Sequence, residues 1–388
     1  MSAKEKMGNS VDAGEIVADS NPPPMLRKLE EDNRRLRRRM EELKLELGEH
    51  DAVFESIRRE FKSVELMGPN ICVPAQTGKS ARVSAPVSAV MVLSDWHIGE
   101  VTEADEIEDF NQFSWAIAQK RAYYLQKQFV NWVAVQRTAT VVDELVVLVV
   151  GDLISGDIHH ELQVTNEFPV PVQSVRAGVL VAKMIAELAP HFKSVRVEFV
   201  TADNHSRLTK KPQWKEGGYN SYGYIVGWVA AERLAKLKNV KVNLHCKVKT
   251  LVEVQGFKYL CMHGHNIKGW AGFPWYGTDR QIASEAKARR RKPSKNFDKV
   301  IIGHFHAPLW TNDYIVNGSL SGTSELDHAL GRHADPCQVA FLVHPKYGEM
   351  NKIEFLVHNG DNENYGGAEV ALREKSGYEA ETLFGSSE

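Results

Sequence analysis

The stretch IIGHFHAPLW, residues 301–310, places two histidines directly after a short apolar run. The isoleucines are typical of the end of a buried strand, and the glycine and proline are typical of a turn. A lone loop histidine most often has only a structural role. Neutral imidazole is also a common ligand for divalent transition metals, so His304 and His306 become candidate ligands if similar residues occur in the same setting elsewhere.

The same setting occurs four more times along the chain. Apolar runs lead into polar residues in VMVLSDWHIGE (90–100), ELVVLVVGDLISGD (144–157), VRVEFVTADNHS (195–206) and FKYLCMHGHNI (257–267). In an α/β sheet, residues that follow parallel strands meet at the carboxyl edge, so these endings predict one shared site. Its candidate residues are Asp95, His97, Asp152, Asn204, His205, His263, His265, His304 and His306.

The chemistry of these candidates narrows the kind of site. A set of His, Asp and Asn without cysteine thiolate suits divalent ions such as Mn, Fe, Zn, Ni or Co rather than a structural zinc site built on cysteine. Seven ligand-type side chains are too many for one four-coordinate ion, but they suit two ions that share a bridging carboxylate. Two-metal sites, with ions about 3.5–4 Å apart, commonly support in-line displacement at phosphorus.

The order of the motifs, Asp-x-His, Gly-Asp, Asn-His, His-Gly-His and Gly-His-x-His over residues 88–320, resembles the calcineurin-like metallophosphoesterase superfamily, in particular its nuclease and phosphodiesterase branch. The resemblance implies two divalent metal ions, with Mn as the first expectation and Fe, Zn, Ni or Co as alternatives. The ligands that it implies are Asp95, His97 and His306 for one ion, Asn204, His263 and His304 for the other, and Asp152 as the bridge.

The resemblance also implies a catalytic role for two residues. A hydroxide bridging the ions at Asp152 would attack phosphorus, while the ions hold the phosphate oxygens. His205 would stabilise the transition state or protonate the leaving oxygen. The implied activity is hydrolysis of a phosphate ester.

Two departures from the family pattern affect the expected branch. Family members usually have Gly-Asn-His followed by an acidic residue, whereas this chain has DNHS at 203–206. Protein Ser/Thr phosphatases carry Gly-Asp-x-Val-Asp-Arg-Gly, and here Ser155 and Gly156 take the places of the second Asp and the Arg, which argues against that branch. Asp157 could orient His205 instead, or it could cap the following turn.

Cations and an aromatic ring follow the third motif in HSRLTKKPQWK, residues 205–215. Such a combination suits a nucleic-acid backbone with a base stacked on the ring, although a solvated charged face has the same composition. The expected substrate-binding residues are Arg207, Lys210, Lys211, Trp214 and His265.

Three other stretches allow two interpretations each. The basic run KARRRKPSK at 287–295 is either a solvated face or a second contact for a polyanion. The aromatic run GWAGFPWYG at 269–277 is either a loop lining the substrate cleft or a hydrophobic lid packed on the fold. His159 and His160 are expected at the start of a surface helix, without a metal role, rather than in the cleft.

The N-terminal part of the chain has a different character. Residues 1–24 are polar and end in three prolines, which predicts a disordered tail. Over residues 25–64, apolar residues recur at alternating steps of three and four, with Asn33 in the seam; this heptad pattern predicts a coiled coil that forms a homodimer or a higher homo-oligomer, unless the helix packs on its own domain. The other expected segments are a linker at 65–87, the metallophosphoesterase domain at 88–358 and a C-terminal tail at 359–388.

We expect an α/β fold with two packed mixed β-sheets flanked by helices, the four-layer sandwich of the family. Helical patterns cover residues 111–136, 172–188 and 222–237. The strand patterns expected to complete the second sheet cover residues 248–254, 314–317, 338–343 and 352–357.

Composition limits the partners and the compartment. The chain has 388 residues and a net charge of −2, so contact with nucleic acid must come from local basic patches. The four cysteines have no paired spacing, which favours a reducing environment. There is no apolar run of transmembrane length and no secretion signal, so we expect a cytoplasmic protein without a membrane partner.

Three functions remain open from the sequence. The first is a metal-dependent phosphodiesterase that acts on DNA or RNA, as a nuclease or end-processing enzyme. The second is a phosphatase or phosphodiesterase for small nucleotides or phosphorylated metabolites. The third is a catalytically silent nucleic-acid-binding or structural protein that keeps the fold as a scaffold.

Overall fold

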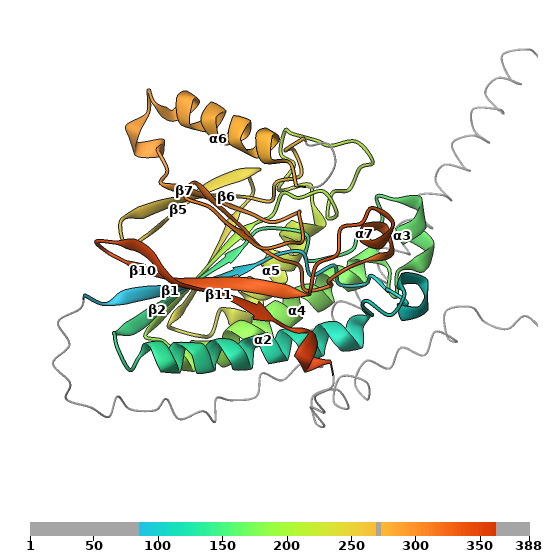
Figure 1. The fold of residues 1–388 in the computed structure, drawn as a ribbon, viewed down its shortest axis with the longest axis horizontal. Coiled ribbons are helices and arrows are strands. Elements are labelled where there is room, and N and C mark those ends of the chain that lie inside the picture. Colours follow the sequence, from blue (N-terminus) through green and yellow to red (C-terminus); the bar gives the residue numbers. More distant parts are fainter. Residues whose placement is uncertain (1–84, 269–272, 362–388) are drawn as a thin grey trace, which may run out of the picture. The chain divides into compact units, whose positions relative to one another are not determined.

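The structure is a computed structural model that describes residues 85–268 and 273–361 (Figure 1). The predicted N-terminal tail, the predicted coiled coil and most of the predicted linker lie outside these residues, as do all but the first three residues of the predicted C-terminal tail. Among the described residues, no helix combines the length and the apolar character that a membrane crossing needs.

The first β-sheet consists of β1 (Val87–Leu93), β2 (Val142–Val149), β3 (Ser194–Val200), β4 (Val240–His245), β10 (Cys337–His344) and β11 (Gly348–Leu356). Its order is β11-β10-β1-β2-β3-β4. The strands from β1 to β4 are parallel, whereas β10 pairs antiparallel with both β1 and β11. Parallel neighbours need crossover connections, which explains why helical segments separate β1 to β4 along the chain.

The second β-sheet consists of β5 (Lys249–Val254), β6 (Phe257–Met262), β7 (Lys299–Ile302), β8 (Leu309–Trp310) and β9 (Tyr314–Val316). Its order is β5-β6-β7-β9-β8, with parallel pairs in the centre and antiparallel pairs at both edges. Both sheets are therefore mixed, and the predicted fold class is confirmed.

The helices are α2 (Trp115–Gln136), α3 (His160–Thr165), α4 (Val170–Leu188), α5 (Tyr222–Leu234), α6 (Trp275–Arg289) and α7 (Glu325–Ala329). Short 3-10 turns occur at η1 (Ala104–Ile107), η2 (Ala189–His191), η3 (Pro293–Lys295) and η4 (His358–Gly360). The three predicted helical patterns correspond to α2, α4 and α5 to within about four residues at each end.

Alternate residues of β1 enter two different cores. Met91 and Leu93 pack with Leu125 of α2 in a core between the first sheet and its helices. Val92 packs with Ile301 of β7 in a second core between the sheets. A third core lies on the outer face of the second sheet, beneath α6. The layers are therefore helices, first sheet, second sheet and α6, as Figure 1 shows.

The prediction that residues 338–343 and 352–357 complete the second sheet is wrong. They belong to β10 and β11 of the first sheet, where Leu342 lies opposite Ala89 of β1. β1 and nearly all of β10 are buried on both faces, so their apolar runs carry no alternation that would indicate a partner strand. Pairing between segments so far apart is a tertiary property.

Gln338 is a fully buried polar side chain where β1 ends. Its Oε1 accepts hydrogen bonds from Ser94 N (3.0 Å), Trp96 Nε1 (3.3 Å) and Asn317 Nδ2 (3.1 Å). Its Nε2 donates to the carbonyl oxygens of Ser94 (3.1 Å) and Gly318 (2.8 Å). This one amide therefore joins the end of β1 to the segment that follows β9.

Replacing Gln338 by Leu should lower the free energy of unfolding by about 3 kcal/mol, because each buried group left without a partner costs roughly 1–3 kcal/mol. Urea unfolding of the full chain measures the change. The matched control is Gln112→Leu at an exposed position, which should change stability little. Equal stability of the two variants would contradict a structural role for Gln338.

Candidate metal centre

The predicted ligands follow strands of both sheets. Asp95 and His97 follow β1, Asp152 follows β2, Asn204 and His205 follow β3, His263 and His265 follow β6, and His304 and His306 follow β7. Three groups have ligand atoms within 4.8 Å of one another, and these are Asp95, His97 and His306; His97, Asp152 and His205; and Asp152, His263 and His304. The five strand ends thus converge, although the expectation of a single sheet edge is wrong, because two of the strands belong to the second sheet.

The backbone at these positions is strained. Positive φ angles occur at Asp95 (56°), His97 (47°), Asp152 (47°), His304 (71°) and His306 (59°). Residues other than glycine rarely adopt this left-handed conformation, which costs on the order of 1–3 kcal/mol at each position. Such strain persists only where the surrounding structure enforces it.

Contacts between the loops enforce this conformation. Trp96 N donates to Asp152 O at 2.9 Å, and Gly303 N donates to His263 O at 3.0 Å. A Cβ atom on Gly303 would lie 2.7 Å from Asp95 Oδ2, so only glycine lets the β7 loop approach the β1 loop this closely. The loops from both sheets therefore hold one another in place.

The first group of side chains points its nitrogen and oxygen atoms inward. His97 Nε2 lies 3.2 Å from His306 Nε2, which lies 3.7 Å from Asp95 Oδ1. On the far side of each ring, His306 Nδ1 lies 3.3 Å from Asp327 Oδ2 and His97 Nδ1 lies 3.5 Å from Glu100 Oε2. The hydrogen bond between His306 and Asp327 is typical of metal-binding histidines, because the carboxylate orients the ring and raises its basicity. His97 Nδ1 forms no hydrogen bond within the described residues, and burial raises the pKa of Glu100 to about 7.

The two histidines of this group differ in charge. Burial lowers the pKa of His97 well below its ordinary value, and His205 and His306 add to the effect. Burial also acts to lower the pKa of His306, but the hydrogen bond with Asp327 and the nearby Asp95 raise it to about 9. His97 is therefore neutral, as a ligand must be. His306 carries a positive charge that a metal cation can replace.

The group of Asp152, His263 and His304 contains atoms without hydrogen-bond partners. His263 Nδ1 donates to Val150 O at 2.9 Å, so its Nε2, 2.8 Å from Asp152 Oδ2, is left for another ligand contact. Among the described residues, neither of these two buried atoms nor Asn204 Oδ1 has a hydrogen-bond partner. Polar atoms are rarely buried in this way, and a cation would satisfy all three. Asp152 belongs to the group with His263 and His304 and also to the group with His97 and His205, and His97 belongs to the group with Asp95 and His306. The donor set is therefore continuous and fits two divalent ions.

His205 lies beside these groups. Its Nδ1 lies 2.6 Å from the carbonyl oxygen of Ser155, to which it donates, and its Nε2 lies 4.0 Å from Asp152 Oδ2. The interpretation that Asp157 orients this ring is wrong, because the Ser155 carbonyl does so. Gly156 follows, and a Cβ atom there would lie 2.0 Å from His205 O. The residue in the place of the phosphatase arginine is therefore glycine for steric reasons.

The unusual residues around Asn204 also have a structural explanation. Asp203 does not have a positive φ angle, so the position does not require glycine. Its carboxylate accepts hydrogen bonds from Ser206 N at 2.7 Å, Ser206 Oγ at 2.5 Å and Asp152 N at 3.1 Å. Burial raises the pKa of Asp203 to about 7. The acidic residue thus stands before the Asn-His pair rather than after it, and it ties the β3 loop to the β2 loop.

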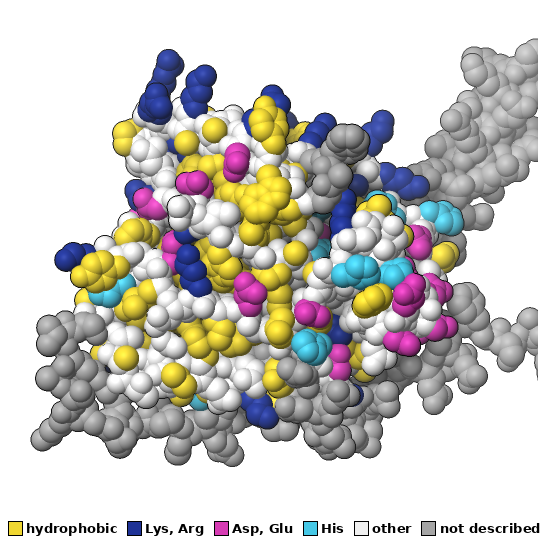
Figure 2. All heavy atoms as spheres, in the orientation of Figure 1, with side chains coloured by type: hydrophobic (Ala, Val, Ile, Leu, Met, Phe, Trp, Pro, Cys, Tyr) yellow, Lys and Arg dark blue, Asp and Glu magenta, His cyan; other side chains and the backbone are white. Residues whose placement is uncertain are grey.

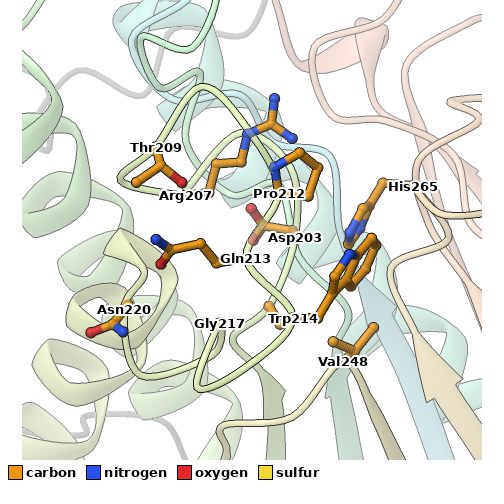
Figure 3. A pocket seen from close by; sticks show the side chains of 11 residues that line it. Asp203, Arg207, Thr209, Pro212, Gln213, Trp214, Gly217, Asn220, Val248 and His265 are labelled. Atoms are coloured by element: carbon orange, nitrogen blue, oxygen red, sulfur yellow. The ribbon is translucent and has the colours of Figure 1, made fainter.

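A pocket opens beside this site (Figure 3). It is small and partly open to solvent, and Asp203, Arg207, Trp214 and His265 are among its lining residues. The rings of Trp214 and His265 are parallel, with an angle of 6° between their planes and 6.1 Å between their centres. The structure therefore brings together three of the predicted substrate-binding residues.

Lys210 and Lys211 are exposed on the same loop and do not line the pocket. A substrate contact by Lys210 and Lys211 therefore stays a prediction. A loop exposes its tip to solvent, so neighbouring residues in sequence need not share a pocket.

The remaining stretches lie at the rim. α3 begins at His160, which confirms the predicted helix start, but the ring of His159 lies beside His205, with 6.2 Å between ring centres, so its expected place away from the site is wrong. Of the aromatic run, residues 269–272 lie outside the described residues, and Phe273 packs on Phe305, with 4.9 Å between ring centres. Trp275 and Tyr276 are exposed at the start of α6. Phe273 therefore behaves as a packed lid residue, whereas the following two rings face solvent.

Sequence reasoning missed Glu100 and Asp327. A signal for Asp327 was present, because Ser324 and Asp327 have the spacing of a capping box, and both of its hydrogen bonds form at the start of α7. Nothing in the sequence connects this short helix with His306. The same carboxylate therefore caps a helix and orients a histidine.

Removing divalent ions with a chelator should lower the Tm of the protein, because it leaves buried ligand atoms without partners. The expected change is about 5–10 °C, since a ligand at 100 times its Kd contributes about 2.7 kcal/mol. Calorimetry with and without added ions measures it. Asp152→Asn should lose most of the response and Asp335→Asn, at an exposed position, should keep it; an unchanged Tm in the wild type would exclude a bound ion.

Asp327→Asn should weaken the binding of one metal ion about 10–100-fold, because the carboxylate behind His306 is lost while a side chain able to cap α7 remains. Metal content after dialysis against a limiting free-ion concentration gives the readout. Glu325→Gln, in the same helix, is the control and should keep the wild-type content. Equal metal content in both variants would show that Asp327 serves only as a helix cap.

Three solved structures that are similar to this chain share 12–13% identity with it. Vps29 of Entamoeba histolytica, solved with zinc, shares 12% identity at a TM-score of 0.25, covering 69% of this chain and 98% of its own. Vacuolar protein sorting 29 of Cryptosporidium parvum shares 13% at a TM-score of 0.30, covering 70% and 100%. A predicted phosphoesterase of Streptococcus pneumoniae shares 12% at a TM-score of 0.24, covering 46% and 90%.

No curated protein matches the sequence. The family profile described as calcineurin-like phosphoesterase matches residues 88–335, which contain all the predicted ligands. Since this match spans more than half of the chain, the protein belongs to the calcineurin-like phosphoesterase family.

Proposed function

We propose that this protein is a dinuclear metal-dependent phosphoesterase that hydrolyses phosphodiester bonds in nucleic acid, as a nuclease or end-processing enzyme. The observation that carries the proposal is the position of Asp152, which belongs to two groups of ligand atoms and lies beside His205. A pocket lined by Arg207 and by the stacked rings of Trp214 and His265 opens next to this arrangement.

The chain provides a complete set of residues to hold two ions. Asp95, His97 and His306 would bind one, Asn204, His263 and His304 would bind the other, and Asp152 would contact both. When bound, two divalent ions would neutralise the charge on phosphate oxygens and lower the pKa of water near phosphorus. Mn remains the first expectation.

His205 is placed to act on the leaving group. The Ser155 carbonyl accepts the Nδ1 proton, so the ring presents its Nε2 atom toward the site. In the imidazolium form, Nε2 carries a proton that can pass to the leaving oxygen. This side chain is thus positioned by hydrogen bonds rather than by metal contact.

The pocket supports a nucleic-acid substrate. Arg207 supplies a cation for phosphate, and Trp214, which is 60% exposed, offers a ring on which a base can stack. His265 extends the same aromatic platform toward His263, with 5.7 Å between ring centres. A strand bound here would place a base on the platform and a phosphate near the ligand groups.

A second candidate function is hydrolysis of small nucleotides. The pocket is compact, and its polar lining includes Gln213 and Asn220, which could hydrogen-bond a base or a sugar. The two candidates differ in the substrate contacts that they require outside the pocket, because only a polymer extends beyond it.

His205→Asn should lower kcat for nucleic-acid cleavage about 10²–10⁴-fold, because the proton donor is lost. The effect on bis(p-nitrophenyl) phosphate should be much smaller, since p-nitrophenolate leaves without a proton. Metal content should stay at the wild-type value. The control is His333→Asn, an exposed histidine. Equal losses on both substrates would exclude the proton-donor role.

The substrate is tested with labelled single- and double-stranded DNA and RNA, alongside the small esters, after resupply of Mn, Ni, Zn or Mg. Asp152→Asn serves as the inactive blank. Cleavage of polymer that disappears in the blank supports the proposal. Activity on small esters alone favours the second candidate, and no activity with any ion favours a non-catalytic scaffold.

A further inference from the structure

α6 is a basic helix with little contact to the rest of the domain. Of its fifteen residues, only Thr278 is buried. The helix and the segment that follows carry a cluster of exposed cations, which we call the α6 basic cluster: Arg280, Lys287, Arg290, Arg291, Lys292 and Lys295. Figure 2 shows a row of Lys and Arg side chains along the upper edge of the molecule, where α6 lies in Figure 1.

These cations are not explained by local structure. Arg289 pairs with Glu285 at 2.9 Å, but no member of the α6 basic cluster forms an ion pair with another described residue. Cations in the last turn of a helix interact favourably with its dipole, which accounts for Lys287. Arg291, Lys292 and Lys295 lie beyond the end of the helix. Their concentration therefore points to an anionic partner.

α6 begins beside the candidate metal centre. Phe273, two residues before the helix, packs on Phe305, which lies between His304 and His306. Gly277 of α6 is packed against Lys268, since a Cβ atom there would lie 2.2 Å from Lys268 O. The helix thus leads away from the site, with its basic end farthest from it.

The start of α6 carries exposed aromatic rings, as the pocket does. His265, on which Trp214 stacks, lies in the segment that leads to Lys268. Trp275 and Tyr276, which are 53% and 78% exposed, follow at the start of the helix. Exposed rings therefore occur both at the pocket and at the start of α6.

The opposite side of the site is acidic. η1 and the residues after it expose Glu103, Asp105, Glu106, Glu108 and Asp109. Glu325 of α7 accepts a hydrogen bond from Glu103 N at 3.1 Å, so these acids lie next to the helix that carries Asp327. Figure 2 shows Asp and Glu side chains gathered on the right of the same view, where Figure 1 places α7. A polyanion is attracted on the α6 side and repelled on the α7 side.

We propose that the α6 basic cluster binds the backbone of a nucleic-acid strand and leads it to the pocket at Trp214. This proposal rests on the proposed function for its substrate class. A helix of fifteen residues is about 22 Å long, so the basic end of the cluster lies several nucleotides beyond the pocket. A long strand reaches Arg290, Arg291 and Lys292, whereas a strand of about three nucleotides at the pocket does not.

Nucleic acid fits this surface better than an anionic membrane does. Membrane-surface helices present large apolar side chains opposite their cations. In the described part of the chain, no large apolar side chain is exposed between residues 277 and 297. The exposed rings lie instead at the end of α6 nearest the pocket, where bases can stack on them.

The test compares two triple variants of the full chain in an Asp152→Asn background, which prevents cleavage. The first removes three members of the cluster, as Arg290→Gln, Arg291→Gln and Lys292→Gln. The matched control removes three exposed lysines at the amino end of β4, as Lys236→Gln, Lys238→Gln and Lys241→Gln. Both change the net charge equally, but the control does so away from the site.

Binding of labelled single strands of about 3 and about 20 nucleotides is measured against salt concentration. The cluster variant should bind the long strand about 10–100-fold more weakly, with a salt slope reduced by about 2, because each phosphate contact contributes about 0.7. Its affinity for the short strand should not change. The control variant should match the parent protein for both strands.

The outcomes separate this proposal from the proposed function. Equal behaviour of the two triple variants would overturn the proposal even if the wild type cleaves nucleic acid. Length-dependent loss in the cluster variant would support it even if the wild type hydrolyses only bis(p-nitrophenyl) phosphate. Loss of binding to phosphatidylserine vesicles, with strand binding unchanged, would overturn it in favour of a lipid surface.

Discussion

The candidate metal centre depends on a left-handed backbone at residues that are not glycine. Asp95, His97 and Asp152 adopt this conformation where β1 and β2 end, and His304 and His306 adopt it after β7. Each position costs free energy, which hydrogen bonds between loops of both sheets offset. The two sheets must therefore pack with their strand ends in register before ligand side chains can face one another. The core between the sheets, which includes Val92 and Ile301, supplies that alignment.

The same constraint gives the site two unlike halves. Carboxylates lie behind His97 and His306, whereas backbone carbonyls orient His263 and His205. A carboxylate adds negative charge near the ion and a carbonyl adds only a dipole, so the two halves differ in electrostatic potential. This asymmetry extends outward, since α7 and η1 make the surface acidic on one side and α6 makes it basic on the other. The acidic surface thus lies on the side of the site where Asp327 contacts His306, and the basic surface lies on the side of α6.

Much of the site was predictable because its chemistry is local. A ligand-type residue directly after an apolar run can be recognised without knowing which sheet holds the strand, and all the predicted His and Asp ligands converge. Partners that act across the fold could not be recognised. Asp157 was the candidate partner of His205 because it follows the Gly-Asp motif, yet the Ser155 carbonyl orients the ring. No sequence pattern identifies a backbone carbonyl as a partner. Ser324 and Asp327 have the spacing of a capping box, which forms at the start of α7. The contact of Asp327 with His306 exists only in the folded chain.

The sequence by itself determined the fold class, the main helices and the identity of the ligand-type residues, because hydrophobic periodicity and side-chain chemistry are properties of short segments. The tertiary structure decided which sheet received β10 and β11, because β1 and β10 are buried on both faces and carry no pattern that selects a neighbour. It also decided that Arg207, Trp214 and His265 share a pocket while Lys210 and Lys211 do not. Those assignments depend on contacts between distant segments, and such contacts form only when the cores close.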